Sequence, residues 1–173
     1  MSAELPPSEA IPPAKGTDLV WVDSTTKERA TLIDGLPWGA RFPWPELQVL
    51  AAATCMMKVK KGGVIFKEAH PGDFMALLFE GDVQVFRADP DGVARLMVTV
   101  RSGQTLGEMS LVDEWTRSGT AIAITEARMI VLGRAGYDHL CANHPRVALR
   151  LMTQFARLIS QRLRRASSAL VQP

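Results

Sequence analysis

Short apolar runs separated by turn residues fill the middle of this 173-residue chain. Runs of this length, alternating or continuously apolar, predict a succession of β-strands. We expect strands at residues 57–60, 64–66, 74–79, 83–86, 94–100, 121–125 and 129–132. Eight or so short strands at this spacing predict a mainly β fold, either a rolled sheet or a sandwich.

One turn in this pattern is particularly clear. Residues 89–92, with the sequence Asp-Pro-Asp-Gly, predict a hairpin between two strands. Because side chains alternate along a strand, Leu96, Val98 and Val100 then lie on one face of the returning strand.

Helices are expected on both sides of the strands. Pro45 begins a short helix whose inward face would be Leu47, Leu50 and Ala51. Residues 136–142 form a second short helix, and residues 146–169, which contain no Gly or Pro, form a long one. The apolar stripe of the long helix consists of Ala148, Met152, Phe155, Ile159, Leu163, Ala166 and Leu170.

The long helix does not follow a strict heptad, because Arg162 falls on its apolar seam. We therefore expect it to pack against its own strands rather than form a long coiled coil. A short dimer contact stays open, and the oligomeric state is not predicted.

We divide the chain into three parts. Residues 1–41 are polar and Pro-rich and predict a largely disordered arm. Trp21, Trp38 and Trp44 indicate that parts of this arm dock on the body. Residues 42–135 form the rolled sheet, and residues 136–173 form the C-terminal helices. We expect no output domain, such as a helix-turn-helix, beyond these helices.

The charge is unevenly distributed. No Asp or Glu follows Asp138, whereas six Arg residues do, so the preceding part holds 14 basic and 18 acidic residues. The basic final helix is either a solvated face or a surface for a nucleic acid, an acidic partner or an anionic lipid.

Composition argues against several other classes. No apolar run approaches the roughly 20 residues that span a bilayer, and the N-terminus has no signal core, so we expect a cytoplasmic protein. Cys55 and Cys141 favour buried thiols over a disulfide. The three His residues lack metal-ligand spacing and there is no Gly-x-Ser-x-Gly elbow, so we expect neither a metal cofactor nor an enzyme.

The candidate site lies in residues 106–120. Gly107 permits an unusual backbone dihedral, and Glu108 begins a short helical turn whose first N–H groups favour a phosphate. Arg117 would close over that phosphate with a planar cationic fork. Glu108 would repel a phosphate but accept hydrogen bonds from a sugar, so the set suits a ribose phosphate. Singly, each of these residues also has an ordinary structural explanation.

Gly107-Glu108-Met109-Ser110-Leu111, with Arg117 ten residues after the glycine, resembles the phosphate-binding cassette of cyclic nucleotide-binding domains. These domains occur in cyclic-AMP-dependent kinase regulatory subunits, cyclic-nucleotide-gated channels and catabolite activator proteins. The resemblance extends from about Phe42 to the last helix. Further matching segments are residues 61–68, 72–73 and 80–85. The resemblance implies an eight-stranded β-roll of the jelly-roll type with a C-terminal helical lid.

The resemblance also implies residue roles. Glu108 would accept from the ribose 2′-hydroxyl, and Arg117 would bind the cyclic phosphate. The backbone N–H groups of Met109 and Ser110, with the hydroxyl and N–H of Ser118, would complete the phosphate shell.

Gly107 would let the backbone approach the sugar, while Val98 and Val100 would line the base. Met152 and Phe155 are candidates for capping the base. Two positions depart from the family pattern: Ser110, whose hydroxyl could add a donor, and Gly119, which could loosen the strand that follows.

The expected function is therefore a stand-alone sensor of cyclic AMP, less readily of cyclic GMP, for which Ser118 is permissive. The last helix would signal to a separate protein partner. The alternative is a scaffold that keeps the fold without the ligand and binds a protein or nucleic acid through its basic helix.

Overall fold

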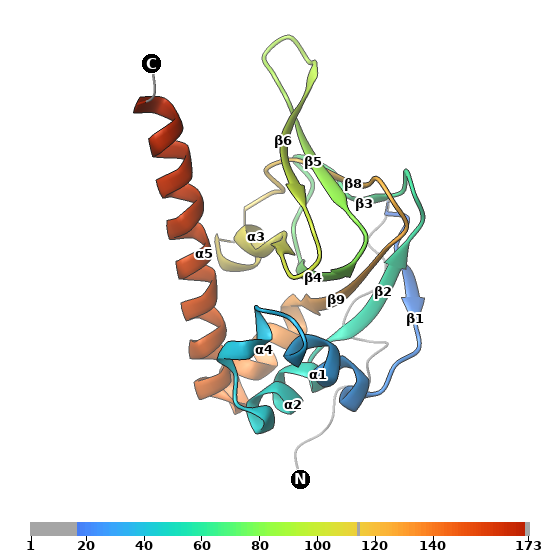
Figure 1. Ribbon diagram of the computed structural model, residues 1–173, viewed down its shortest axis with the longest axis vertical. Coiled ribbons are helices and arrows are strands. Elements are labelled where there is room, and N and C mark those ends of the chain that lie inside the picture. Colours follow the sequence, from blue (N-terminus) through green and yellow to red (C-terminus); the bar gives the residue numbers. More distant parts are fainter. Residues whose placement is uncertain (1–16, 114, 172–173) are drawn as a thin grey trace.

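A computed structural model of the chain describes residues 17–113 and 115–171 (Figure 1). Two antiparallel sheets form a β-roll, and helices cover one end of it. The strands are β1 (Val20–Val22), β2 (Cys55–Val59), β3 (Val64–Phe66), β4 (Phe74–Glu80), β5 (Val83–Ala88), β6 (Ala94–Val100), β7 (Thr105–Leu106), β8 (Thr120–Ala123) and β9 (Ala127–Gly133). The prediction of a mainly β fold with flanking helices is confirmed.

The strand order explains how the roll closes. One sheet has the order β1-β2-β9-β4-β7 and the other the order β3-β8-β5-β6. The turn at residues 89–92 joins β5 to β6 as predicted. Gly92 N donates to Asp89 O at 2.9 Å, which is the hydrogen bond that closes a four-residue turn. Within the hairpin, Val83 pairs with Val100 and Val85 with Val98.

The segment 17–41 differs from the prediction of a disordered arm. It forms β1, the helix α1 (Thr26–Asp34) and the 3-10 helix η1 (Gly39–Arg41). Strand β1 pairs with the edge of β2, and α1 buries Ala30 and Ile33. Residues 1–16 of the predicted arm lie outside the described residues.

Two of the three tryptophans expected to dock on the body do so. Trp21 packs against the core of the roll, and Trp38 packs against the helical core. Trp44, in contrast, is exposed.

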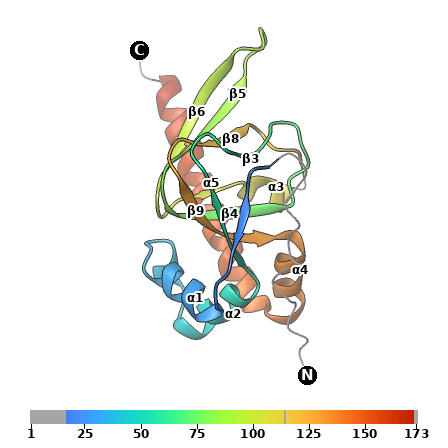
Figure 2. The same cartoon turned by 90° about the vertical axis from the view of Figure 1, so that its right-hand side faces the viewer.

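The helices build a second core beneath the roll (Figure 2). Helix α2 (Trp44–Ala52) buries Leu47, Leu50 and Ala51, which is the predicted inward face. These side chains pack with residues of α1, β4, β9, α4 (Arg134–Asn143) and α5 (Pro145–Val171). Among the described residues, no helix is both long and apolar enough to span a membrane.

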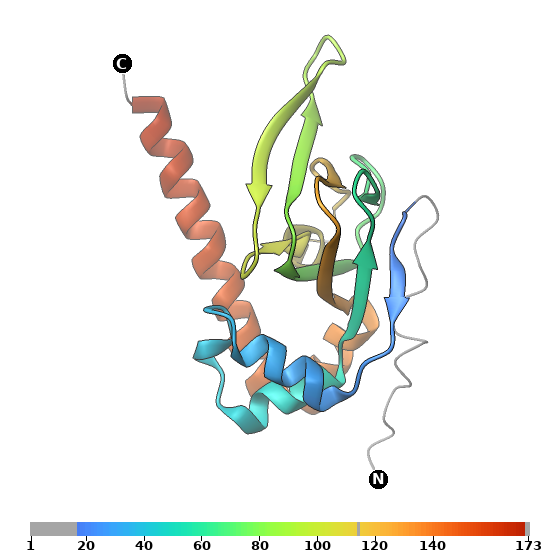
Figure 3. The ribbon, with the colours of Figure 1, turned by 45° about the vertical axis from the view of Figure 1, so that its right-hand side comes forward.

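Helix α5 runs along one side of the molecule, from the helical end to the level of the β5–β6 hairpin (Figures 1 and 3). Its first half packs as predicted, because Ala148 and Phe155 are buried in the helical core. Farther along, Ile159 and Leu163 are exposed. Among the stripe residues whose side chains the structure describes, those of the first half therefore pack against the body, and mainly against helices rather than strands. The side chains of Ala166 and Leu170 lie outside the described ones.

Candidate functional site

The short helix α3 (Glu108–Asp113) follows β7 through a left-handed turn at Gly107. Gly107 has φ 77°, and a Cβ there would lie 2.5 Å from Arg117 Nη1 and 3.1 Å from Phe74 O. Glycine is required here by both the dihedral and the close approach. As at any helix start, the first N–H groups of α3 lack an intrahelical acceptor. The predicted turn and short helix are both present.

Arg117 reaches back to this turn from the loop before β8. Its Nη1 donates to Gly107 O at 3.0 Å and to Ser110 Oγ at 2.7 Å. Its guanidinium carbon lies 4.3 Å from the ring centroid of Phe66 and 4.5 Å from that of Phe74. Aromatic faces stabilise a cation that has lost its water. The protein's own groups thus hold the cation against α3.

Burial sets the charge properties of Arg117. The loss of water lowers the pKa of its guanidinium to about 10, against the opposing influence of Asp73 and Glu108. Its Nε and Nη2 atoms are buried and have no hydrogen-bond partner among the described residues. A buried cation with two unsatisfied donors is costly, and an anion that accepts from both would relieve the cost.

The backbone fixes Arg117 from the other side. Arg117 N donates to His70 O at 2.8 Å, and Ala69 N donates to Arg117 O at 2.9 Å. Gly72 lies so close to the site that a Cβ there would meet Ser110 Oγ at 2.1 Å. The loop of residues 69–72 therefore supports the arginine, and His70 has a backbone role in it.

Glu108 is fully buried beside Arg117 and is paired with a residue that sequence reasoning did not assign to the site. Arg162 of α5 donates through Nη1 to Glu108 Oε1, and through Nη2 to Thr105 O at 3.1 Å. The second carboxylate oxygen, Oε2, is buried without a partner among the described residues, as is the hydroxyl of Thr105. One oxygen of Glu108 thus anchors α5, and the other is an unused acceptor.

The structure brings Gly107, Glu108, Ser110 and Arg117 together, as predicted. The Ser110 hydroxyl is not a free donor, however, because it accepts from Arg117 and donates to Gly107 O at 3.2 Å. Its role is to position the arginine, and only its backbone N–H is left for a ligand.

The remaining predicted residues differ in how far their side chains are exposed. The side chains of Met109 and Ser118 are exposed. Val100 is buried in the core of the roll, whereas Val98, on the same strand face, is 44% exposed. Of the two candidates for a base cap, Phe155 is buried in the helical core and Met152 packs against that core. Neither is free to cover a ligand in this conformation, which is a correction to that expectation.

Gly119 also differs from expectation. A Cβ at this position would lie 2.6 Å from Phe86 O and 3.0 Å from Val85 Cγ1. The glycine therefore lets the chain entering β8 approach β5 closely, and it does not loosen the strand.

The signal for Arg162 was present in the sequence. It lies seven residues after Phe155, on the side of α5 that faces the body. An arginine on the side of a helix that turns toward the roll favours an acidic partner there, and Glu108 is the acid assigned to the site.

Chemically, the cluster offers a cationic fork, a carboxylate and a bare helix start within one buried corner. These groups are suited to binding and orienting a ligand, and none of them is paired as a nucleophile with a base. Among the described residues, no group of three or more His, Cys, Asp or Glu side chains is placed to hold a metal ion.

Comparison with known proteins agrees with this geometry. The sequence matches the cyclic nucleotide-binding domain family over residues 56–144. A CRP-like cAMP-activated global transcriptional regulator of Mycobacterium tuberculosis is 29% identical over 132 residues, which cover 75% of this chain and 57% of that protein. A cyclic AMP receptor protein of Thermus thermophilus is 34% identical over 110 residues, covering 64% of this chain and 49% of that protein. The chain thus spans about half the length of these relatives.

Solved structures show the same architecture. A cyclic nucleotide-binding domain from Methylobacillus flagellatus superposes with a TM-score of 0.78 at 24% identity, covering 89% of this chain and 88% of that one. The catabolite activator protein of Thermus thermophilus superposes with a TM-score of 0.65 at 31% identity, covering 80% of this chain and 61% of that one. With its β-roll, its cassette turn and its matched residues, this chain belongs to the family of cyclic nucleotide-binding domains.

Proposed function

We propose that this protein is a sensor that binds a cyclic nucleotide, cyclic AMP in preference to cyclic GMP, at the cassette. The observation that carries the proposal is the pair of buried, partly unsatisfied side chains: Arg117, with two free donors, and Glu108, with one free acceptor. A cyclic phosphate would accept from Arg117, and the ribose 2′-hydroxyl would donate to Glu108 Oε2. Relatives named as cAMP-activated or cyclic AMP receptor proteins support the choice of nucleotide.

The rest of the ligand would extend from these two anchors. The N–H groups of Met109 and Ser110 face the helix start, where a phosphate is favoured by the dipole. Ser118 would contribute its hydroxyl and N–H from the strand side. Val98 would contact the base, with Val100 behind it as part of the apolar wall.

Signalling would pass through α5. Glu108 binds Arg162 through Oε1, so a ribose at Oε2 would share the same carboxylate with the helix. A ligand shifts a conformational equilibrium by its differential affinity for the two states. Closure of α5 over the base, with Arg162 as its anchor, would then be favoured by the nucleotide and would be read by a separate protein.

A thermal-shift series tests nucleotide binding directly. Ligand at 100 times its dissociation constant adds ~2.7 kcal/mol to stability, and a domain of this size gains about 2–4 °C per kcal/mol. Cyclic AMP should therefore raise the melting temperature by about 5–10 °C, cyclic GMP less, and linear 5′-AMP little. The absence of any shift with millimolar cyclic nucleotides would reject the proposal.

A further inference from the structure

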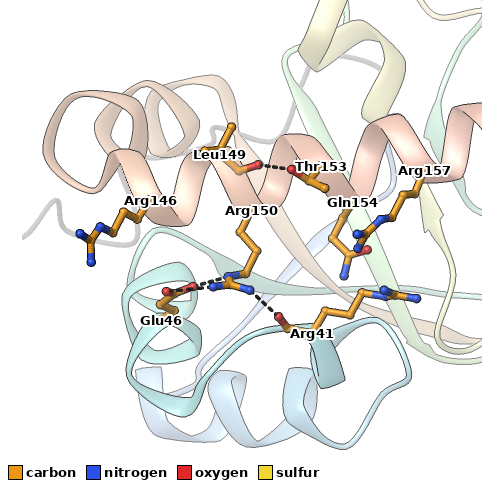
Figure 4. A pocket seen from close by; sticks show the side chains of 8 residues that line it. All are labelled: Arg41, Glu46, Arg146, Leu149, Arg150, Thr153, Gln154 and Arg157. Atoms are coloured by element: carbon orange, nitrogen blue, oxygen red, sulfur yellow. Dashed lines mark hydrogen bonds and ion pairs between the residues drawn. The ribbon is translucent and has the colours of Figure 1, made fainter.

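A second charged feature lies on α5, away from the cassette. The first half of α5 and the segment of η1 and α2 enclose a hollow of about 380 Å³, which we call the arginine groove (Figure 4). The residues that matter in it are Arg41, Glu46, Arg146, Leu149, Arg150 and Arg157. The groove ends at Arg157, five residues before the Arg162 anchor, so the two sites share a helix but no side chain.

The arginine groove is lined by more cationic side chains than its carboxylate can pair with. Arg150 donates through Nε to Glu46 Oε2 at 2.6 Å and through Nη1 to Arg41 O at 3.2 Å, which pins α5 to η1 and α2. This pair uses the carboxylate of Glu46. The side chains of Arg41, Arg146 and Arg157 have no carboxylate partner within the part of the chain that the structure describes.

These cations are arranged along a line. Arg146, Arg150 and Arg157 lie on one side of α5, and the span from the first to the last is about 16 Å at 1.5 Å per residue. In Figure 4, Arg41 extends toward the end of the groove where Arg157 lies, Arg157 points back along the groove, and Arg146 lies at the other end with its guanidinium directed outward. Guanidinium forks bind carboxylates and phosphates in a bidentate manner. An extended polyanion therefore fits the groove better than a single small anion.

An apolar residue decides between two polyanions. Leu149 lines the groove and is 70% exposed. A peptide presents acidic and apolar side chains together, so it matches both the cations and Leu149. A nucleic-acid backbone presents phosphates but no apolar group beside them, and would leave Leu149 uncovered.

We propose that the arginine groove docks an acidic segment of a partner protein, with carboxylates bound to Arg41, Arg146 and Arg157 and an apolar side chain covering Leu149. Because the arginine groove would be the surface through which the sensor contacts its partner, this inference rests on the proposed function. Peptide binding is nevertheless measured without nucleotide, so the two proposals fail separately. An extended segment spanning about 16 Å corresponds to about five residues.

The test is fluorescence anisotropy with a labelled, end-capped octapeptide of aspartate and glutamate that carries one central leucine. Removing two bidentate partners in the double variant Arg41→Gln/Arg157→Gln should weaken binding by about tenfold or more. The matched control is Lys60→Gln/Lys61→Gln, which removes the same charge from an exposed turn and should change affinity by less than about twofold. Replacing the leucine of the peptide by serine should weaken binding to the wild type.

Other outcomes overturn the proposal. The first is no binding of the peptide at low salt, and the second is an equal loss of peptide affinity in the groove variant and the control variant. The third is a single-stranded oligonucleotide of equal charge that binds more tightly than the peptide, if only its affinity, and not that of the peptide, falls in the groove variant. The groove variant should keep its cyclic AMP thermal shift, because Arg117, Glu108 and Arg162 are unchanged. Peptide binding without any nucleotide shift would reject the sensor and retain the groove.

Discussion

The contact between Glu108 and Arg162 makes a quantitative prediction about stability. The Glu108 side chain is 1% exposed, whereas that of Arg162 is 40% exposed. In Arg162→Ala, the carboxylate stays buried and loses its partner. In Glu108→Gln, the remaining guanidinium is open to water. We therefore expect the arginine variant to be the less stable of the two.

The magnitude follows from the burial of each partner. Breaking a fully buried ion pair from one side costs ~3–5 kcal/mol. Because Arg162 is partly exposed, water enters in its place, and we expect about 1–3 kcal/mol. At about 2–4 °C per kcal/mol for a domain of this size, the melting temperature should fall by ~5 °C.

Thermal and urea unfolding without nucleotide would measure this effect in Arg162→Ala, Glu108→Gln and the double variant. The double variant should recover part of the loss, which gives the coupling energy of the pair. Arg164→Ala, at an exposed position two residues farther along α5, is the matched control. If Arg162→Ala and Arg164→Ala melt within about 1 °C of each other, Arg162 does not anchor α5 and the reasoning is refuted.

Three further predictions concern the cassette and the thiols. Gly107→Ala places a Cβ 2.5 Å from Arg117 Nη1 at φ 77°, so it should lower the free energy of unfolding by ~1–3 kcal/mol and weaken nucleotide binding. Unchanged affinity by calorimetry would contradict the assigned geometry. Burial lowers the pKa of Arg117 only to about 10, so the guanidinium stays cationic near neutrality and nucleotide affinity should be constant from about pH 7 to about pH 9. A loss of affinity across this range in a calorimetric series would contradict a permanently charged arginine as the phosphate partner. Burial raises the pKa of the Cys55 thiol to about 12, whereas Cys141 is exposed. An aromatic disulfide reagent should therefore react with one thiol in the native protein and with two after unfolding. Rapid reaction of both thiols in the native protein would show that Cys55 is accessible.

Much of the fold follows from local patterns in the sequence. The turn at residues 89–92 and the inward face of α2 were predictable because each depends on a few neighbouring residues. The buried thiol of Cys55 was predictable for the same reason, since it lies in an apolar strand. Cys141 was expected to be buried and is exposed, because it lies on the outer side of the short helix α4.

The segment 17–41 shows where composition misled the prediction. Its polar residues concealed a capping box, in which Thr25 accepts from Glu28 N at 3.2 Å and Glu28 accepts from Thr25 N at 2.6 Å. Arg29 of the same helix is buried and donates to Ala51 O at 3.2 Å. Such a tertiary contact has no local sequence signature, whereas the Thr25-x-x-Glu28 spacing is a helix-start signal that our prediction did not use.

The site residues also divide into those with a local sequence signal and those that depend on a tertiary contact. Gly107, Glu108 and Arg117 were predictable because the cassette is compact in sequence and has a fixed spacing. For Arg162 the sequence indicates only a cation on the inward side of the helix, and its pairing with Glu108 has no local signature because the two residues are 54 positions apart. Its position on the apolar seam argues against a coiled coil, and the physical reason for a cation there is the buried acid that it contacts.

Isothermal titration of cyclic AMP into the wild type, Arg117→Ala and Arg128→Ala tests the central claim most directly. Arg128 lies on β9 and pairs at 3.6 Å with Glu80, so its removal takes away a cation without touching the cassette. Losing the phosphate partner should weaken binding by ~2–5 kcal/mol in Arg117→Ala, while Arg128→Ala should bind like the wild type. Cyclic AMP binding of equal strength in Arg117→Ala and the wild type, or no heat of binding in any of the three at millimolar ligand, would contradict the account.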